Sequence, residues 1–280
     1  LLSRGLGDEY KRQPYTPSNE LAGQKFVCAS RYKDGTPTNS LRQDFVYQND
    51  VHLLRLLDYL KTTEDPRRTG HPLIENTMVI FTSDNGAEKN DKRFTGPVRS
   101  NKGSTYEGGH RIPFIASWPL GNVGDGNDKT PGETQTSLLA LNDLYATLAE
   151  VVGKELPPVS GEGRGAEDSV SQLAALQGDV EFVRFGAIFP NDHQEASKKL
   201  ADERAVVAVR TNAAPVEGQW KLFLDHRYAF KGQLHPTALY DLSKDPQEMK
   251  NLLGNPKVKP ILDHLLELAR EAAGEAGSSR

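Results

Sequence analysis

Two polar side chains follow directly on a short apolar run and could bind a metal ion. The run TMVIFT occupies residues 77–82, and the tetrapeptide SDNG follows it at residues 83–86. Asp84 offers a carboxylate and Asn85 an amide oxygen, and both are hard donors of the kind that Ca²⁺ and Mg²⁺ prefer. Gly86 would let the backbone turn sharply past such an ion. The same tetrapeptide is also a common way to leave a strand, so a plain turn is the alternative interpretation.

A second segment has the residue types that an oxyanion site needs. It reads KGSTYEGG at residues 102–109, with Arg99 shortly before it and His110 directly after it. Small residues let a sulfate or phosphate group approach closely, and Lys102 is a suitable point charge for such a group. We therefore expect Arg99 and His110 to contact a substrate beside Lys102. A flexible, solvated loop is the alternative.

Two strands and two helices are expected to position these segments. The run at 77–82 is β-branched and continuously apolar, which is typical of a central strand buried on both faces. Residues 112–118 predict a second strand, which stops at Pro119. Apolar residues at helical spacing predict helices over 40–61 and 138–152. Ligands of open α/β sheets bind beyond the carboxyl ends of the strands, which is where SDNG would lie.

The character of the chain changes after the glycine-rich segment GEGRG. Four short apolar runs follow at 182–189, 205–210, 220–224 and 238–242, and their order predicts an antiparallel sheet. A last helix is expected to begin near Asn255-Pro256, because an N-cap residue with proline at the first helical position is a typical helix start. The sequence therefore predicts an α/β part over residues 1–165 and a small α+β subdomain over residues 166–280.

The composition excludes some classes of partner. The 280 residues include 34 Lys and Arg against 38 Asp and Glu, a formal net charge of -4. A balance so close to neutral gives no reason to expect nucleic acid or an anionic membrane surface as a partner. No run approaches the ~20 apolar residues that a membrane-spanning helix requires, and the first residues show no signal-peptide pattern. Cys28 is the sole cysteine, so no disulfide can form within the chain.

Taken together, three segments resemble the type I sulfatase family, the formylglycine-dependent, arylsulfatase-like branch of the alkaline-phosphatase superfamily. They are residues 80–86, 102–109 and 111–115. Later segments agree in order and type, namely DLYATL, WKLF, LYDL and DPQE. The resemblance spans roughly residues 40–255 and covers only the C-terminal portion of such a protein.

The resemblance implies a fold and a chemistry. The fold would be a partial alkaline-phosphatase-like α/β sandwich, its N-terminal half missing, followed by a small antiparallel sheet and a helix. Such enzymes hydrolyse sulfate esters, and part of their Ca²⁺ site is an Asp-Asn pair that matches Asp84 and Asn85. The sulfate-contacting lysine matches Lys102, a catalytic role because its charge offsets the charge that develops on the sulfuryl group. The substrate would be a small sulfate ester or a sulfated glycan, and the family is commonly periplasmic or secreted.

The chain departs from this pattern where the nucleophile would lie. Formylglycine arises from Cys or Ser in a Cys/Ser-x-Pro/Ala-x-Arg motif, and the segment CASR that starts at Cys28 does not fit it. The family's two upstream aspartates have no match either. We therefore expect a truncated sulfatase that is inactive alone and needs the missing N-terminal segment as a partner. The alternatives are a non-catalytic module that binds anions or sulfated glycans, and a phosphatase or phosphodiesterase relative.

Overall fold

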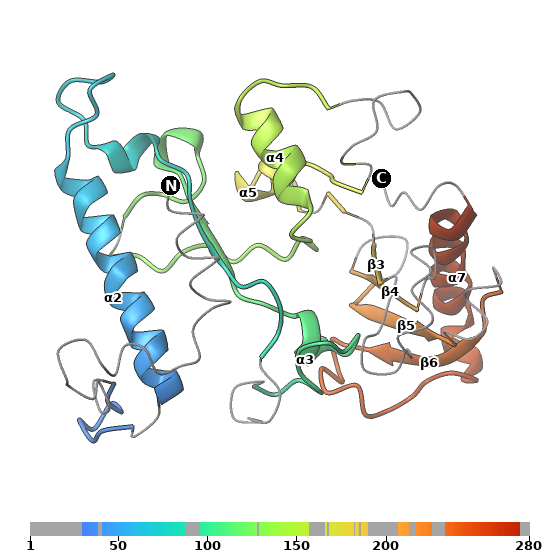
Figure 1. The fold of residues 1–280 in the computed structure, drawn as a ribbon. Coiled ribbons are helices and arrows are strands. Elements are labelled where there is room, and N and C mark those ends of the chain that lie inside the picture. Colours follow the sequence, from blue (N-terminus) through green and yellow to red (C-terminus); the bar gives the residue numbers. More distant parts are fainter. Residues whose placement is uncertain are drawn as a thin grey trace, which may run out of the picture. The chain divides into compact units, whose positions relative to one another are not determined.

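The structure consists of two compact units, residues 1–77 and residues 78–280, labelled by element in Figure 1. The predicted division after residue 165 stays a prediction, and Cys28 lies outside the described residues. The computed structural model describes residues 30–38, 41–87, 96–127, 129–156, 166, 168–181, 183–184, 186–189, 207–212, 217–225 and 233–274.

The first unit contains one long helix, as the apolar spacing predicts. Helix α2 runs Leu41–Thr62, and the 3-10 turn η3 follows at Leu73–Asn76. The buried carboxylate of Asp44 accepts hydrogen bonds from the backbone amide and the hydroxyl of Ser30, which ties the preceding segment to the first turns of the helix. Several large apolar side chains of α2 remain exposed: Val46, Tyr47, Leu54, Leu56 and Tyr59.

The second unit begins with a two-stranded antiparallel ribbon. Strand β1 (Val79–Thr82) pairs with β2 (Phe114–Ser117), and Phe81 faces Ile115 across the ribbon. Both strands lie within the predicted ranges, but β1 is not buried on both faces. Phe81 is 44% exposed and Ile115 63% exposed, because among the described residues each strand pairs only with the other.

Helix α4 (Asp143–Val151) is shorter than predicted and buries a different face from its apolar stripe. Tyr145, Leu148 and Val152 are exposed, whereas Asp143, Ala146 and Thr147 are buried. The Asp143 carboxylate forms a buried ion pair with Arg184 and also accepts from the amides of Ala140 and Val170 and from Gln172. This polar cluster therefore fixes α4 to the segment that contains the short helix α5 (Leu173–Leu176).

The antiparallel sheet of the C-terminal part is confirmed. Its order is β3 (Ala187–Phe189), β4 (Ala208–Thr211), β5 (Trp220–Leu224) and β6 (Pro236–Asp241). Helix α7 (Lys259–Gly274) packs on one face, after the 3-10 turn η6 (Pro256–Val258) in which the Asn255 side chain accepts from the amide of Lys257. The core between sheet and helix includes Val209, Leu222, Leu239, Leu265 and Ala269, all fully buried.

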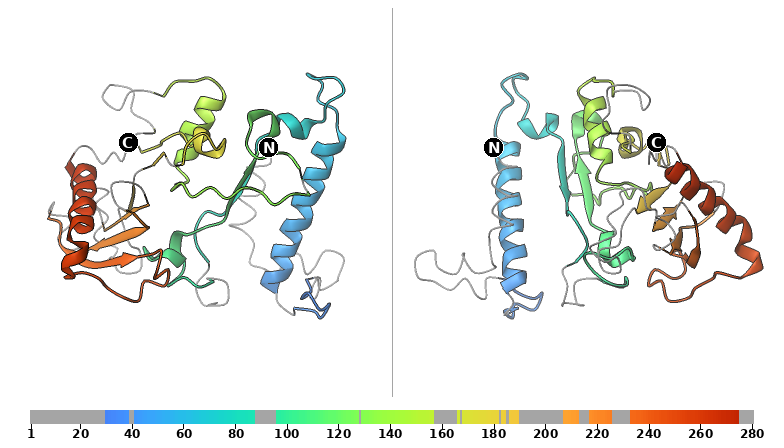
Figure 2. Two further views of the ribbon diagram at one scale, coloured as in Figure 1. Left: turned by 180° about the vertical axis from the view of Figure 1, so that it is seen from behind. Right: turned by 45° about the vertical axis from the view of Figure 1, so that its right-hand side comes forward.

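The alternation of side chains along β5 leaves a second buried face on this sheet. Because successive strand residues point to opposite faces, Trp220, Leu222 and Leu224 contribute to the core with α7. Lys221 and Phe223 point to the other face, toward the one-turn helix α3 (Glu107–His110). Figures 1 and 2 show α3 and α7 on opposite sides of the sheet. No helix of the described residues is long and apolar enough to cross a membrane.

Candidate functional site

The segment after β1 presents two oxygen donors in an open position. Asp84 is exposed, and its carboxylate has no hydrogen-bond partner among the described residues. The side-chain Nδ2 of Asn85 donates to the carbonyl of Gly86 at 2.9 Å, and no described residue donates to its side-chain oxygen. The Ser83 hydroxyl donates to the Asn85 carbonyl at 3.0 Å and so stabilises the turn. One carboxylate and one amide oxygen fit a hard cation in kind.

The number of donors is small for such an ion. Ca²⁺ takes about six to eight oxygen ligands, and these two residues supply only a minority of them. Within the described ranges, no group of three or more His, Cys, Asp and Glu residues is placed to hold a metal. The residues therefore fit part of a calcium site.

Backbone hydrogen bonds bring the two predicted motifs together. The amide of Gly86 donates to the carbonyl of Gly109 at 2.9 Å, and the amide of Lys102 donates to the carbonyl of Ala87 at 2.8 Å. The amide of Gly108 donates to the carbonyl of Arg99 at 2.8 Å. The main chains of SDNG and of KGSTYEGG thus lie side by side, which places Lys102 next to the segment that carries the two oxygen donors.

The three glycines of these motifs permit the close approach. A Cβ atom on Gly86 would lie 2.0 Å from the Gly108 carbonyl oxygen, and one on Gly109 would lie 1.9 Å from that of Ser104. A Cβ on Gly108 would lie 2.3 Å from the Ser100 carbonyl oxygen. These distances are far below any van der Waals contact. Gly86 is therefore required because of its neighbours, and not because of the sharp turn that the sequence suggests.

A buried ionic cluster includes residues of the segment 102–110, which we call the glycine turn. Glu107 opens α3, and its Oε1 lies 3.1 Å from the Nζ of Lys221, whose side chain is completely buried. Lys221 Nζ also lies 3.3 Å from Glu248 Oε1. The imidazole Nε2 of His110 lies 3.2 Å from Lys221 Nζ and 3.3 Å from Glu107 Oε1. Arg210 completes the cluster, with its Nε 3.4 Å from Glu107 Oε1.

The pKa values of this cluster follow from burial and mutual charge. Burial opposes the ionisation of Glu107, but the hydrogen bond with His110 and the charges of Arg210 and Lys221 outweigh it. The pKa of Glu107 therefore lies far below its usual 4.5. Burial lowers the pKa of Lys221 and of His110, and it raises the pKa of Glu248. Glu107 is thus the carboxylate that stays ionised most firmly.

Arg99 is engaged with the protein itself. Its Nη1 donates to the backbone carbonyl of Glu248 at 2.8 Å, and its guanidinium lies 3.8 Å above the centre of the Tyr106 ring. His110 likewise turns its ring toward Glu107 and Lys221 and packs against Phe189 at a ring distance of 4.4 Å. Contact of Arg99 and His110 with a substrate stays a prediction, and both residues also have a structural role.

No sequence pattern predicted a role for Lys221 or Glu248 in the site. A signal for Lys221 exists in the run WKLFL, because a lysine within a short apolar strand of a buried sheet requires a charged partner. No pattern identifies that partner, since Glu107 is 114 residues away in the chain and Glu248 lies beyond the next strand.

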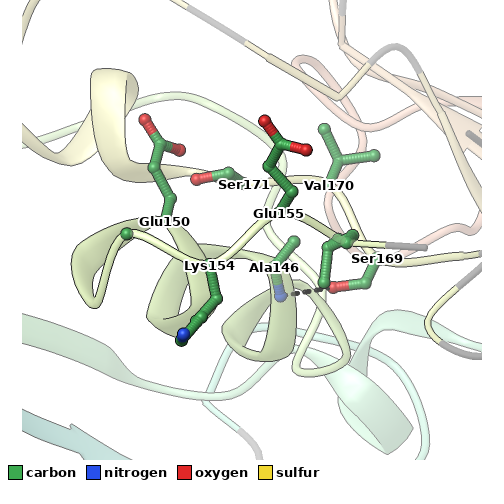
Figure 3. A pocket seen from close by; sticks show the side chains of 9 residues that line it. Ala146, Glu150, Lys154, Glu155, Ser169, Val170 and Ser171 are labelled. Atoms are coloured by element: carbon green, nitrogen blue, oxygen red, sulfur yellow. Dashed lines mark hydrogen bonds between the residues drawn. The ribbon is translucent and has the colours of Figure 1, made fainter. Parts of the chain in front are cut away.

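A separate hollow lies between α4 and residues 169–171 (Figure 3). Glu150, Lys154 and Glu155 line it, and the hydroxyl of Ser169 accepts a hydrogen bond from the amide of Ala146 at its base. None of the predicted site residues lines this hollow.

Comparison with known proteins gives a consistent result. A sequence model of the Sulfatase family matches residues 7–154, which begins well before the residue 40 at which the motif resemblance starts. Human arylsulfatase A is 34% identical over 227 residues, covering 74% of this chain and 41% of that protein. An N-acetylgalactosamine-6-O-sulfatase of Bacteroides thetaiotaomicron is 32% identical over 286 residues, covering 94% of this chain and 46% of that protein. The chain thus spans less than half the length of these relatives.

A solved structure supports the fold. It comes from work on glycosaminoglycan metabolism by Bacteroides thetaiotaomicron, where it is designated a sulfatase, and it is 27% identical to this chain. The two structures agree with a TM-score of 0.51 over 83% of this chain and 43% of the other. The fold is accordingly of the alkaline-phosphatase-like α/β type. With the family model matching more than half of its residues, the chain belongs to the sulfatase family.

Proposed function

We propose that this chain contributes Asp84, Asn85 and Lys102 to a site that hydrolyses sulfate esters. The observation that carries the proposal is the pair of backbone hydrogen bonds from Gly86 and Lys102, which joins the two motifs. They bring the backbone of Lys102 beside the segment that carries the two oxygen donors. A site for a sulfate group and a divalent cation needs both.

Asp84 and Asn85 would hold Ca²⁺ through a carboxylate and an amide oxygen. When bound, the ion would polarise the sulfuryl oxygens of the substrate. The open carboxylate of Asp84 and the free amide oxygen of Asn85 support this role. The other ligands would come from the N-terminal portion of a complete sulfatase, which we propose as the partner of this chain.

Lys102 would hold the sulfate group and stabilise its developing negative charge. An ammonium group beside the reacting sulfur does so more strongly in a site from which water is excluded. His110 and Arg99 would contact the rest of the substrate from the edge of the same turn. The bacterial relative is named for action on a sulfated amino sugar, which favours a sulfated glycan as the substrate class over a small aryl sulfate.

The sequence holds no Cys/Ser-x-Pro/Ala-x-Arg motif. We propose that the chain alone therefore binds sulfate esters without hydrolysing them, because the nucleophile would come from the partner segment. This reading also covers the alternative of a binding module, which differs only in having no catalytic partner.

The test is calorimetric titration of the chain with N-acetylgalactosamine 6-sulfate in the presence of CaCl₂, together with an assay of sulfate release. We expect weak, calcium-dependent binding and no release. Lys102→Met should abolish the binding, whereas Lys129→Met, at an exposed lysine away from the motifs, should not. Binding that Lys102→Met leaves unchanged would contradict the proposal, and two bound Zn²⁺ per chain would point to a phosphatase or phosphodiesterase instead.

A further inference from the structure

The glycine turn of the candidate site rests on a lysine that comes from the C-terminal sheet. Lys221 is the second residue of β5, which lies between β4 and β6. It is paired in register with Arg210, so the two cations project from the same face of the sheet. That face is the one opposite the core with α7.

The surroundings of Lys221 hold its charge in a fixed place. A buried ammonium group is costly unless carboxylates and hydrogen bonds match it. Glu107 and Glu248 supply two carboxylates at 3.1 and 3.3 Å. The rings of Phe189 and Phe223 each have their centre 5.2 Å from Nζ and help to shield it from water. Lys221 is therefore held between two acids, and its side chain is completely buried.

Glu248 also binds residues of the candidate site directly. Glu248 Oε2 accepts a hydrogen bond of 2.7 Å from the amide of Glu107, the first residue of α3. The backbone carbonyl of Glu248 accepts a hydrogen bond from the guanidinium of Arg99. The backbone carbonyl of Arg99 in turn accepts a hydrogen bond from the amide of Gly108. Glu248 has a φ of 54°, in the left-handed region that residues with a side chain rarely adopt. Its neighbours thus hold it in an unfavourable backbone conformation.

We propose that Lys221 is a positioning residue of the sulfate site. Its ion pairs with Glu107 and Glu248 fix the position of α3. The hydrogen bond from Gly86 to Gly109 then fixes the segment of Asp84 and Asn85 against the glycine turn. The C-terminal sheet thereby sets the geometry of a site to which it contributes no ligand. The identity of the site as a sulfate site rests on the proposed function, whereas the positioning role rests on these contacts alone.

Hydrogen exchange of the full chain, followed by mass spectrometry of peptides, tests this role. The variant Lys221→Met removes the charge and keeps the length of the side chain. Glu248→Gln is a milder second variant that keeps the acceptor for the Glu107 amide. Lys244→Met is the matched control, because Lys244 pairs with Asp241 but its side chain is 84% exposed.

We expect peptides that cover residues 83–87 and 99–110 to exchange at least about tenfold faster in both variants, because a weakened ionic cluster no longer holds in place the backbone hydrogen bonds that protect these amides. Peptides of β4, β6 and α7 should keep their protection, and Lys244→Met should change nothing. If Lys221→Met fails to fold, Glu248→Gln decides. Unchanged exchange of the turn in a folded variant, or an equal rise in sheet and turn, overturns the proposal.

The result is distinct from that of the binding test. Selective loosening of the turn in a chain that binds no sulfate ester would keep the positioning role and remove the proposed function. Normal binding of the sulfate ester, together with unchanged exchange of the turn in Lys221→Met, would keep the proposed function and remove the positioning role.

Discussion

The amide of Gly86 donates a 2.9 Å hydrogen bond to the carbonyl of Gly109, at a point where neither residue has room for a side chain. This contact joins the segment of Asp84 and Asn85 to the segment that follows Lys102, across 23 positions of sequence. It explains why both motifs contain glycine where they do, and it makes the two segments one structural unit.

The contact predicts the effect of Gly86→Ala. The added methyl group would meet the Gly108 carbonyl oxygen at 2.0 Å, so the two segments must separate. We expect a loss of about 1–3 kcal/mol in the free energy of unfolding, measured by urea denaturation at low protein concentration. Gly132→Ala is the control, because a Cβ there meets nothing within 4 Å and the backbone is not left-handed. Equal stabilities of the two variants would show that the segments are not packed as described.

The buried pair of Asp143 and Arg184 predicts a larger effect. Arg184→Met should cost about 3–5 kcal/mol in the free energy of unfolding, because it leaves the Asp143 carboxylate buried without its cation. The exposed pair of Arg270 and Glu267 provides the comparison, and Arg270→Met should cost less than about 1 kcal/mol. The same denaturation experiment compares both. A cost below 1 kcal/mol for Arg184→Met would mean that α4 is held by other contacts.

His110 predicts a pH dependence of stability. Its folded-state pKa lies below the 6.5 of the free imidazole, chiefly because of burial. As the pH falls through 6.5, the unfolded chain therefore takes up a proton before the folded chain does, and the folded state loses stability until its own pKa is reached. The loss is present below about pH 6.5 and absent above it.

The variant His110→Asn isolates this contribution. The wild type should lose stability relative to the variant between pH 7.5 and pH 5, measured by urea denaturation at each pH. Glu107, Lys221 and Arg210 act on His110, and Glu248 contacts Lys221 in both proteins, so the contrary effect of the raised pKa of Glu248 largely cancels in the difference. A difference that stays constant with pH would show that the imidazole is not buried.

The exposed face of the β1–β2 ribbon predicts self-association of the isolated chain. Phe81 and Ile115 are directly paired and exposed, and no other described strand pairs with the outer edges of the ribbon, which can therefore bind a strand of another molecule. Light scattering should show aggregation of the wild type at micromolar concentration. The variant Ile115→Lys should reduce it, since edge charges oppose strand pairing, whereas Leu120→Lys, at another exposed apolar residue, should reduce it less. A monodisperse wild type with a reversible thermal transition would contradict this.

The sequence predicted those elements whose patterns are local. Helix α2 and strand β5 lie where spacing and residue types place them, and Asn255 caps the last helical segment as expected. The length of α4 and the exposure of β1 were not predictable, because burial depends on which other segments cover an apolar face. The position of α4 is set instead by the long-range contact of Asp143 with Arg184.

The assignment of site residues stays a prediction, although the local motifs on which it rests are joined in the structure. The order of the motifs pointed to Asp84, Asn85 and Lys102, and the structure shows that the backbones of their two segments lie side by side. The role of Lys221 depends on its contact with Glu107, which lies 114 positions away in the sequence. The role of Glu248 depends on its contact with Lys221, from which the edge strand β6 separates it in the sequence. Such contacts leave no periodic trace in a single sequence.

The measurement that tests the central claim most directly is a calcium titration of the chain, followed through the amide resonances of residues 84–87 and 102. We predict saturable shifts confined to these amides, with a dissociation constant on the order of 1 mM or weaker because two ligands make an incomplete site. Asp84→Asn should abolish the shifts. Shifts that persist in that variant, or no saturable response at these amides in the wild type, would contradict the assignment of Asp84 and Asn85 to a metal site of a sulfatase.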